Sequence, residues 1–162
     1  MEASVFYLLA YSVTLLAAFG VITVLSTRQK DADELANYQG LFWKSPVMAI
    51  VLTIALLSLA GIPLTAGFIG KFYVLTSGVE QNLWLPVIML VVTSVIGLYY
   101  YLRIISTLFA ASPATVIKEK TLHPFFYTAM YAALVVLALI LFGLGIFPGI
   151  AIERMREFLE IG

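Results

Sequence analysis

Long apolar segments separated by short polar ones dominate the hydropathy pattern of this chain. The apolar segments cover residues 5–25, 46–79, 83–109 and 125–147. A membrane-spanning helix needs about 20 predominantly apolar residues, and each segment reaches that length. The pattern therefore predicts an all-α membrane protein, a single membrane domain over residues 1–162 with four transmembrane spans.

A short amphipathic segment follows the last apolar one. Within residues 152–161, four apolar side chains recur at helical spacing and so share one face: Ile152, Met155, Phe158 and Leu159. Helices with one apolar and one charged face lie in the membrane interface. We expect a C-terminal surface helix here, either on the bilayer or docked on a neighbouring helix.

The second apolar segment, 46–79, is too long for one upright helix. As a continuous helix it would measure about 50 Å, whereas the hydrocarbon core of a bilayer is about 30 Å thick. Pro63 lies within it; a proline cannot donate a backbone hydrogen bond, and its ring crowds the preceding helical turn. With Gly61 and Gly67 on either side, we expect a discontinuous helix that breaks at residues 61–66.

Two hydroxyl side chains flank the expected break. Ser58 and Thr65 are near enough in the sequence to bond the backbone groups that the break frees. Non-helical backbone at membrane depth is tolerated only inside protein or beside a water-filled cavity, and broken helices mark ion pathways in transporters. Gly61, Pro63 and Gly67 are therefore the candidates for the break, and Ser58 and Thr65 are candidates for lining an ion path.

Lys71 is the only charged residue between Ser45 and Val79. About 12 Å of helix separates it from the polar end of the segment at Glu80, which is farther than a lysine stem reaches. Ionisable groups inside a membrane are costly and usually functional, and burial favours the neutral amine, a form that lysine can adopt but arginine cannot. Lys71 is therefore the candidate proton-transfer residue, with a structural ion pair to another subunit as the alternative.

Arg103 ends the third apolar segment beside three tyrosines, in the sequence GLYYYLRI. An arginine that snorkels to the interface within an aromatic belt is the ordinary interpretation. Because Arg103 lies within the apolar segment, a position along the proton path is the alternative interpretation.

The composition narrows the chemistry that the chain itself can perform. Hydrophobic residues make up 62% of it and charged residues 11%, whereas a soluble domain carries about a quarter charged residues. The net charge of zero gives no indication of nucleic-acid binding. The chain has no cysteine and one histidine, which excludes disulfides, iron–sulfur ligation, haem held by two histidines and most metal sites. No cofactor or metal site is expected in this chain.

The distribution of cations predicts how the chain is oriented. Positive residues gather at the span ends expected on one face, with fewer on the other: Arg28, Lys30, Lys44, Arg103, Lys118 and Lys120 against Arg154 and Arg156. Cytoplasmic loops carry an excess of lysine and arginine. We expect loops 26–45 and 111–124 in the cytoplasm and both termini on the periplasmic side.

Three stretches resemble a known family: SLAGIPLTAGFIGKFYVL, GLYYYLRI and DADELANYQGLFWKSP. They look like the C-terminal part of the antiporter-like membrane subunits of proton-pumping NADH:quinone oxidoreductase, complex I, and most of all like subunit N. The resemblance covers nearly the whole chain. Related subunits occur in multi-subunit sodium/proton antiporters and in membrane-bound hydrogenases, and the tyrosine-rich GLYYYLRI favours subunit N.

The resemblance implies a role for Lys71 and a set of partners. In the family, two inverted repeats each contain a broken helix, and Lys71 occupies the position of the proposed proton-transfer lysine of the second repeat. The chain would be the C-terminal fragment of the subunit. Its partners would be the N-terminal remainder of the subunit and other membrane-arm subunits in a bacterial inner membrane.

The same resemblance places the redox chemistry elsewhere. In the family, NADH, FMN, the iron–sulfur clusters and quinone are bound by other subunits of the complex, which as a whole is the enzyme. Two alternatives remain open: a subunit of a cation/proton antiporter or membrane-bound hydrogenase, and a structural membrane subunit that moves no ion.

Overall fold

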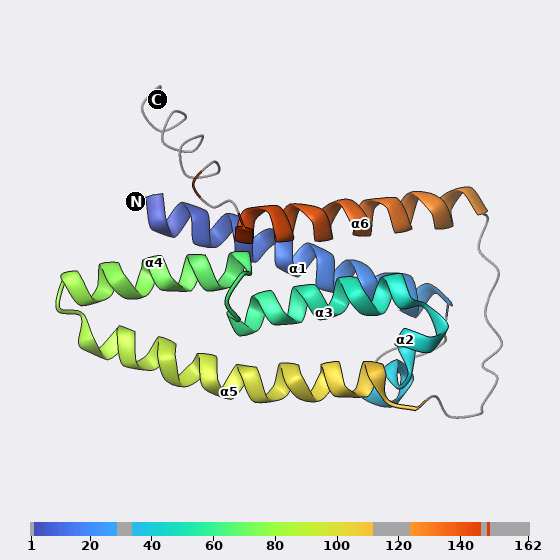
Figure 1. Ribbon diagram of the computed structural model, residues 1–162, viewed down its shortest axis with the longest axis horizontal. Helices are drawn as coiled ribbons and strands as arrows, with labels where there is room; N and C mark the ends of the chain where they lie inside the picture. Colours follow the sequence, from blue (N-terminus) through green and yellow to red (C-terminus); the bar gives the residue numbers. More distant parts are fainter. Residues whose placement is uncertain (1, 29–33, 112–123, 147–148, 150–162) are drawn as a thin grey trace, which may run out of the picture.

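The computed structural model describes residues 2–28, 34–111, 124–146 and 149, and its regular secondary structure there is entirely helical. The elements in chain order are α1 (Glu2–Arg28), η1 (Leu35–Tyr38), α2 (Leu41–Lys44), α3 (Pro46–Ala60), α4 (Ala66–Glu80), α5 (Trp84–Phe109) and α6 (Pro124–Ile146) (Figure 1). Three of these helices contain stretches long and apolar enough to cross a membrane: Val5–Ser26, Trp84–Phe109 and Thr128–Ile146. The prediction of an all-helical protein is confirmed for the described residues, and these three candidate spans agree with a membrane protein.

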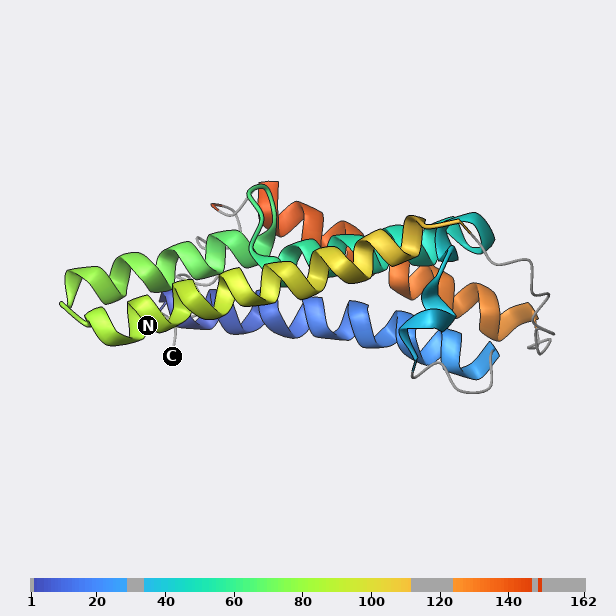
Figure 2. The ribbon, with the colours of Figure 1, turned by 90° about the horizontal axis from the view of Figure 1, so that it is seen from below.

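The long helices run along one common axis, as Figures 1 and 2 show from two directions. α3 and α4 follow one another in the same direction; α3 lies in the middle of the bundle, and α4 continues to the end at which the chain turns into α5. α5 packs along both of them, while α1 and α6 pack against both from other sides. The centre of the bundle is therefore the junction between α3 and α4.

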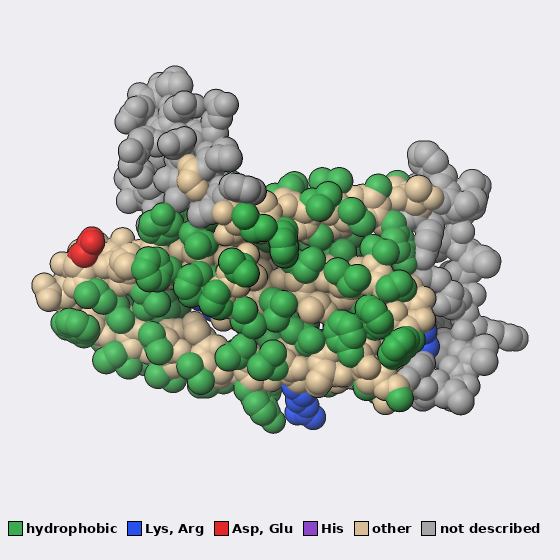
Figure 3. All heavy atoms as spheres, viewed as in Figure 1, with side chains coloured by type: hydrophobic (Ala, Val, Ile, Leu, Met, Phe, Trp, Pro, Cys, Tyr) green, Lys and Arg blue, Asp and Glu red, His purple; other side chains and the backbone are tan. Residues whose placement is uncertain are grey.

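Small side chains let α1 and α3 approach closely. The fully buried residues of these helices include several alanines, which suits helix packing in membranes: Ala10, Ala17, Val21, Met48, Ala49, Leu52 and Ala55. Large apolar side chains instead point outward, and they cover the described part of the face in Figure 3. An apolar exterior over a small-residue core is the arrangement expected of helices that pack within lipid.

α3 ends in a glycine-terminated turn. Gly61 has a φ of 79°, in the left-handed region that favours glycine. Its backbone N–H donates to the Ser58 carbonyl at 3.0 Å, and the N–H of Ile62 donates to the Leu57 carbonyl at 3.1 Å. These two bonds form a Schellman motif, so Gly61 stops the helix at Ala60.

A tight turn then leads into α4. The backbone N–H of Thr65 donates to the Ile62 carbonyl at 3.2 Å. Pro63 occupies the second position of this turn, and Leu64, with a φ of 75°, occupies the third, the arrangement of a type II turn. The non-helical link thus covers residues 61–65.

The observed helix ends differ little from the predicted ones. α1 extends a few residues beyond 5–25 at both ends, and α5 and α6 begin within one residue of the predicted starts at 83 and 125. Within the polar loop, η1 and α2 form, and the N–H of Gly40 donates to the Thr107 carbonyl of α5 at 3.1 Å. The expected surface helix at 152–161 lies outside the described residues.

Candidate functional site

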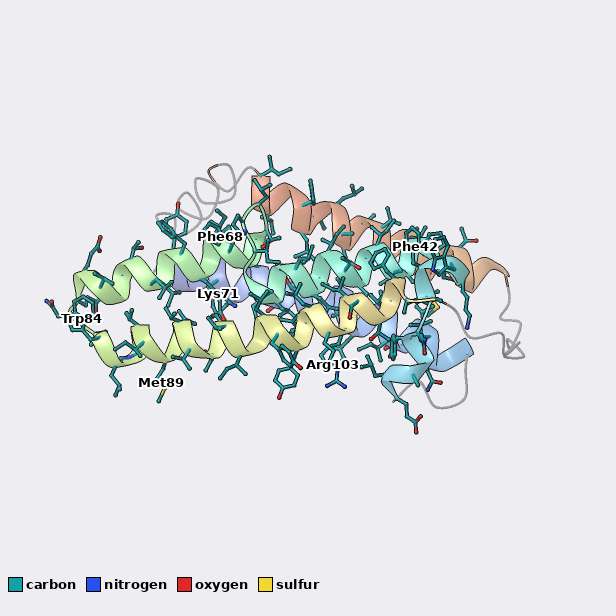
Figure 4. All side chains as sticks on the ribbon, turned by 60° about the horizontal axis from the view of Figure 1, so that its bottom comes forward. Phe42, Phe68, Lys71, Trp84, Met89 and Arg103 are labelled. Carbon is teal, nitrogen blue, oxygen red and sulfur yellow. The ribbon has the colours of Figure 1, made fainter. Side chains whose placement is uncertain are left out.

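Lys71 reaches back from α4 to the end of α3. Its Nζ donates to the main-chain carbonyl of Leu59 at 2.8 Å and to that of Ala60 at 3.3 Å. The side chain is partly buried and lies on the inner side of α4 (Figure 4). The cation predicted beside a helix break therefore contacts main-chain carbonyls that have lost their intrahelical partners at the break.

The carbonyls that Lys71 contacts are the ones that α3 cannot satisfy itself. The last four carbonyls of an α-helix lack intrahelical partners. Those of Leu57 and Ser58 accept from the backbone of Ile62 and Gly61, which leaves Leu59 and Ala60 for the ammonium. The C-terminal end of a helix also carries partial negative charge, which favours a cation there.

Two glycines provide the room for this contact. A Cβ on Gly61 would lie 3.0 Å from Cδ and 3.3 Å from Nζ of Lys71. A Cβ on Gly67, in the first turn of α4, would overlap the Ser58 carbonyl oxygen. Glycine at these positions therefore lets the lysine stem and the start of α4 lie against the end of α3.

Two buried hydroxyls fix the junction from the side of α1. Thr14 Oγ1 donates to the Ala10 carbonyl at 2.6 Å and lies 3.2 Å from Ser58 Oγ. A hydroxyl has one proton, so Ser58 must be the donor to Thr14. Ser58 Oγ in turn accepts from the backbone N–H of Gly67 at 3.1 Å, which connects α1, α3 and α4.

A polar cavity of about 160 Å³ adjoins Lys71. It is lined by Tyr7, Tyr11, Thr14, Ser58, Leu59, Gly67, Lys71, Leu90, Thr93, Ser94, Gly97 and Tyr101. No acidic side chain is among them, so among the described residues the positive charge is balanced by carbonyl and hydroxyl dipoles. A water molecule occupies about 30 Å³ in the liquid, which makes the cavity large enough for several.

An apolar cavity of about 270 Å³ borders the other side of the lysine. Phe68, Phe72, Leu75 and Val95 contribute to its lining, together with Lys71. Lys71 therefore lies between an apolar space and a polar one, and hydroxyl groups that can exchange a proton line mainly the polar one.

The structure brings some of the predicted site residues together and separates others. Ser58, Gly61, Gly67 and Lys71 meet at the junction of α3 and α4. Thr65 instead caps α4, its hydroxyl accepting from the N–H of Phe68 at 3.4 Å, and Pro63 is exposed in the turn.

Arg103 stands apart from this group. Its side chain is exposed on the outer side of α5, away from Lys71 (Figure 4), and it lines neither cavity beside Lys71. Its carbonyl accepts from the hydroxyls of Ser106 and Thr107 within its own helix.

Sequence reasoning missed the contribution of the first apolar segment. Tyr7, Tyr11 and Thr14 of α1 line the polar cavity. Their spacing of four and then three residues places them on one helical face. That polar stripe within an apolar segment was the signal that could have found them.

Comparison with known proteins identifies the family. A family model described as NADH:quinone oxidoreductase/Mrp antiporter, transmembrane, matches residues 1–97. The chain belongs to this family. It is 51% identical to the NADH-quinone oxidoreductase subunit N of Methylococcus capsulatus over 91% of its length, and 48% identical to that of Ectopseudomonas mendocina over 97% of its length. The matched regions are 29% and 32% of those proteins, so the chain spans about a third of the length of these relatives.

A solved structure supports the same family assignment. A chain of respiratory complex I from Thermus thermophilus, with bound aureothin, superposes with a TM-score of 0.78 at 32% sequence identity. The match covers 94% of this chain and 34% of that one. The helical arrangement of this antiporter-family chain is thus also found in a chain of a respiratory complex I.

Proposed function

We propose that this chain contributes to proton translocation as part of a subunit N in the membrane arm of a bacterial NADH:quinone oxidoreductase, with Lys71 as the residue that exchanges the proton. The observation that carries the proposal is the position of Lys71 Nζ, between the exposed carbonyls of α3 and the polar cavity. Redox chemistry, with NADH, FMN, iron–sulfur clusters and quinone, belongs to other subunits of the assembly in this proposal.

The ammonium group has a proton available for exchange. It carries three N–H groups, and the carbonyls of Leu59 and Ala60 accept two of them. The third has no acceptor among the described residues and is available to water in the polar cavity. Release of this proton to water leaves the neutral amine, and uptake of a proton from water restores the ammonium.

The hydroxyls of the cavity are suited to hold such water. Tyr7, Tyr11 and Tyr101 line it. Ser94 lines it as well, but its hydroxyl donates to the Leu90 carbonyl of its own helix at 2.7 Å. We assign the tyrosine hydroxyls as the groups that orient water beside Lys71, and Ser58 as a lining residue whose own proton is engaged with Thr14.

The membrane topology follows from helix lengths. α3 and α4 have 15 residues each and so measure about 22 Å, less than the roughly 30 Å of the hydrocarbon core. We propose that they cross the bilayer together as one broken span, which with α1, α5 and α6 makes four. Four spans place both termini on the same side, which we propose is the periplasmic side of the inner membrane because the cations gather at the opposite face. Further membrane-arm subunits and lipid then cover the exposed apolar faces.

The test compares two replacements of Lys71 in the assembled complex. Lys71→Met removes the ionisable group. Lys71→Arg keeps the positive charge, but a guanidinium group effectively never deprotonates. We expect both to reduce proton uptake per NADH oxidised in membrane vesicles, with complex content checked by blot. Normal pumping by the arginine variant would show that Lys71 acts as a fixed charge, and the proposal would fail.

A cation/proton antiporter or a hydrogenase is the second candidate, because the matching family includes Mrp antiporters. The identity of proteins that purify with the chain separates the candidates. NADH dehydrogenase subunits would support the proposal, and antiporter or hydrogenase subunits would replace it. Full pumping after Lys71→Met would instead favour a structural subunit that moves no ion.

A further inference from the structure

We infer that Lys71 is also the C-terminal cap of α3, so that loss of its proton loosens the link between α3 and α4. The capping role is supported by the hydrogen bonds from Lys71 Nζ to the carbonyls of Leu59 and Ala60. The consequence of proton loss rests on the proposed function, in which Lys71 releases and regains a proton.

Among the described residues, the hydrogen bonds of the link leave one donor for the last two carbonyls of α3. Backbone N–H groups of the Schellman turn serve Leu57 and Ser58. The N–H and the hydroxyl of Thr65 both donate to the Ile62 carbonyl, so they are already engaged. Pro63 has no N–H to offer. Lys71, twelve residues beyond Leu59, donates to the carbonyls of Leu59 and Ala60.

Protonation decides how strong this cap is. Hydrogen bonds from a charged donor are roughly twice as strong as neutral ones, and only the ammonium is attracted to the negative end of α3. The other titratable side chains that line the two cavities are Tyr7 and Tyr11 of α1 and Tyr101 of α5. None of them carries a negative charge near neutral pH, so none can replace the attraction between Lys71 and the carbonyls.

The link is held from two sides, which limits where the loosening can occur. On the side of α1, Ser58 Oγ accepts from the N–H of Gly67 at 3.1 Å and contacts Thr14, and proton loss at Lys71 leaves these bonds intact. On the other side, the carbonyl of Leu64 lies so close to Gly145 of α6 that a Cβ there would overlap it. The loosening is therefore confined to the end of α3 and residues 61–62, because close packing on α6 restrains residues 64–65 and Ser58 holds the start of α4.

The experiment measures hydrogen–deuterium exchange at the amides of Gly61 and Ile62 in the purified assembled complex. Lys71→Met leaves both carbonyls without the cap, so exchange there should rise about tenfold or more, the factor that corresponds to one hydrogen bond to a charged group. Lys71→Arg keeps charged donors, so exchange should stay close to that of the native protein. Equal exchange in the methionine and native proteins would overturn the inference.

A pH series keeps the test decisive if the methionine variant does not assemble. Across about pH 6 to 11, a range that includes the ordinary lysine pKa of about 10.4, protection of Gly61 and Ile62 in the native protein, corrected for the intrinsic rate, should fall about tenfold as Lys71 loses its proton. The arginine variant and a peptide within α5 should show no such fall. A flat native profile would refute the loosening. Normal pumping by the arginine variant would refute the proton-carrier role but leave the cap intact.

Discussion

The hydroxyl groups of Thr14 and Ser58 lie 3.2 Å apart at the buried point where α1 meets α3. Both side chains are only 1% exposed. Because Thr14 already donates to Ala10, Ser58 donates to Thr14 while accepting from the backbone of Gly67. A sequence of two hydrogen bonds thus holds the start of α4 to α1.

Ser58→Ala should therefore destabilise the protein more than Thr14→Val. The alanine variant leaves the partly buried N–H of Gly67 without its acceptor, at a cost of about 1–3 kcal/mol, whereas valine at position 14 leaves the bond between Ser58 and Gly67 in place. Thermal unfolding of the purified complex measures the difference. Thr53→Val is the control, because the Thr53 hydroxyl bonds only the Ala49 carbonyl of its own helix. Equal losses for Ser58→Ala and Thr53→Val would contradict this account.

Gly67→Ala should strongly impair folding or assembly. The added Cβ would meet the carbonyl of Ser58, which is backbone and cannot rotate away. Overpacking in a tight interior costs about 1–3 kcal/mol or more. Gly143→Ala in α6 is the matched control, since a Cβ there meets nothing within 4 Å and alanine favours the helix. Complex content by blot should fall for Gly67→Ala only, and normal content would mean that α4 can shift at little cost.

Tyr101→Phe should slow proton transfer without reducing assembly. The change removes one hydroxyl from the polar cavity and keeps the ring. Loss of one hydrogen bond to water corresponds to about 1 kcal/mol, or roughly fivefold in rate. Tyr99→Phe is the control, because Tyr99 is 64% exposed and lies outside that cavity. The measurement is the initial rate of proton uptake in vesicles for the two variants and the native complex. Identical rates for Tyr101→Phe and the native complex would remove Tyr101 from the proposed route.

The position of the link could be predicted because its causes are local. Gly61 can adopt the left-handed φ that ends α3, and Pro63 has no N–H with which to continue a helix. The observed link at residues 61–65 lies within the predicted 61–66. The lone charge of Lys71 was equally visible, since an ionisable side chain in an apolar segment stands out in any sequence.

The partners of Lys71 could not be predicted because they are not side chains. The sequence offered an ion pair with another subunit as the alternative role of Lys71, and in the structure the ammonium contacts the main-chain carbonyls of Leu59 and Ala60. The tyrosines of the cavity come from α1 and α5, and only the packing of these helices around α4 brings Tyr7 and Tyr101 to one space. Such contacts depend on tertiary structure, which hydropathy and spacing do not specify.

Arg103→Gln should leave proton pumping by the complex close to normal. The Arg103 side chain is exposed on α5 and lines neither cavity beside Lys71, so its charge has no direct route to the proton on Nζ. An exposed charge in water or at the interface is screened and contributes little to distant sites. Proton uptake per NADH oxidised, compared with the native complex and with Lys71→Met, is the measurement. A loss as large as that of Lys71→Met, at unchanged complex content, would restore Arg103 to the proton path and require a second route along the outer face of α5.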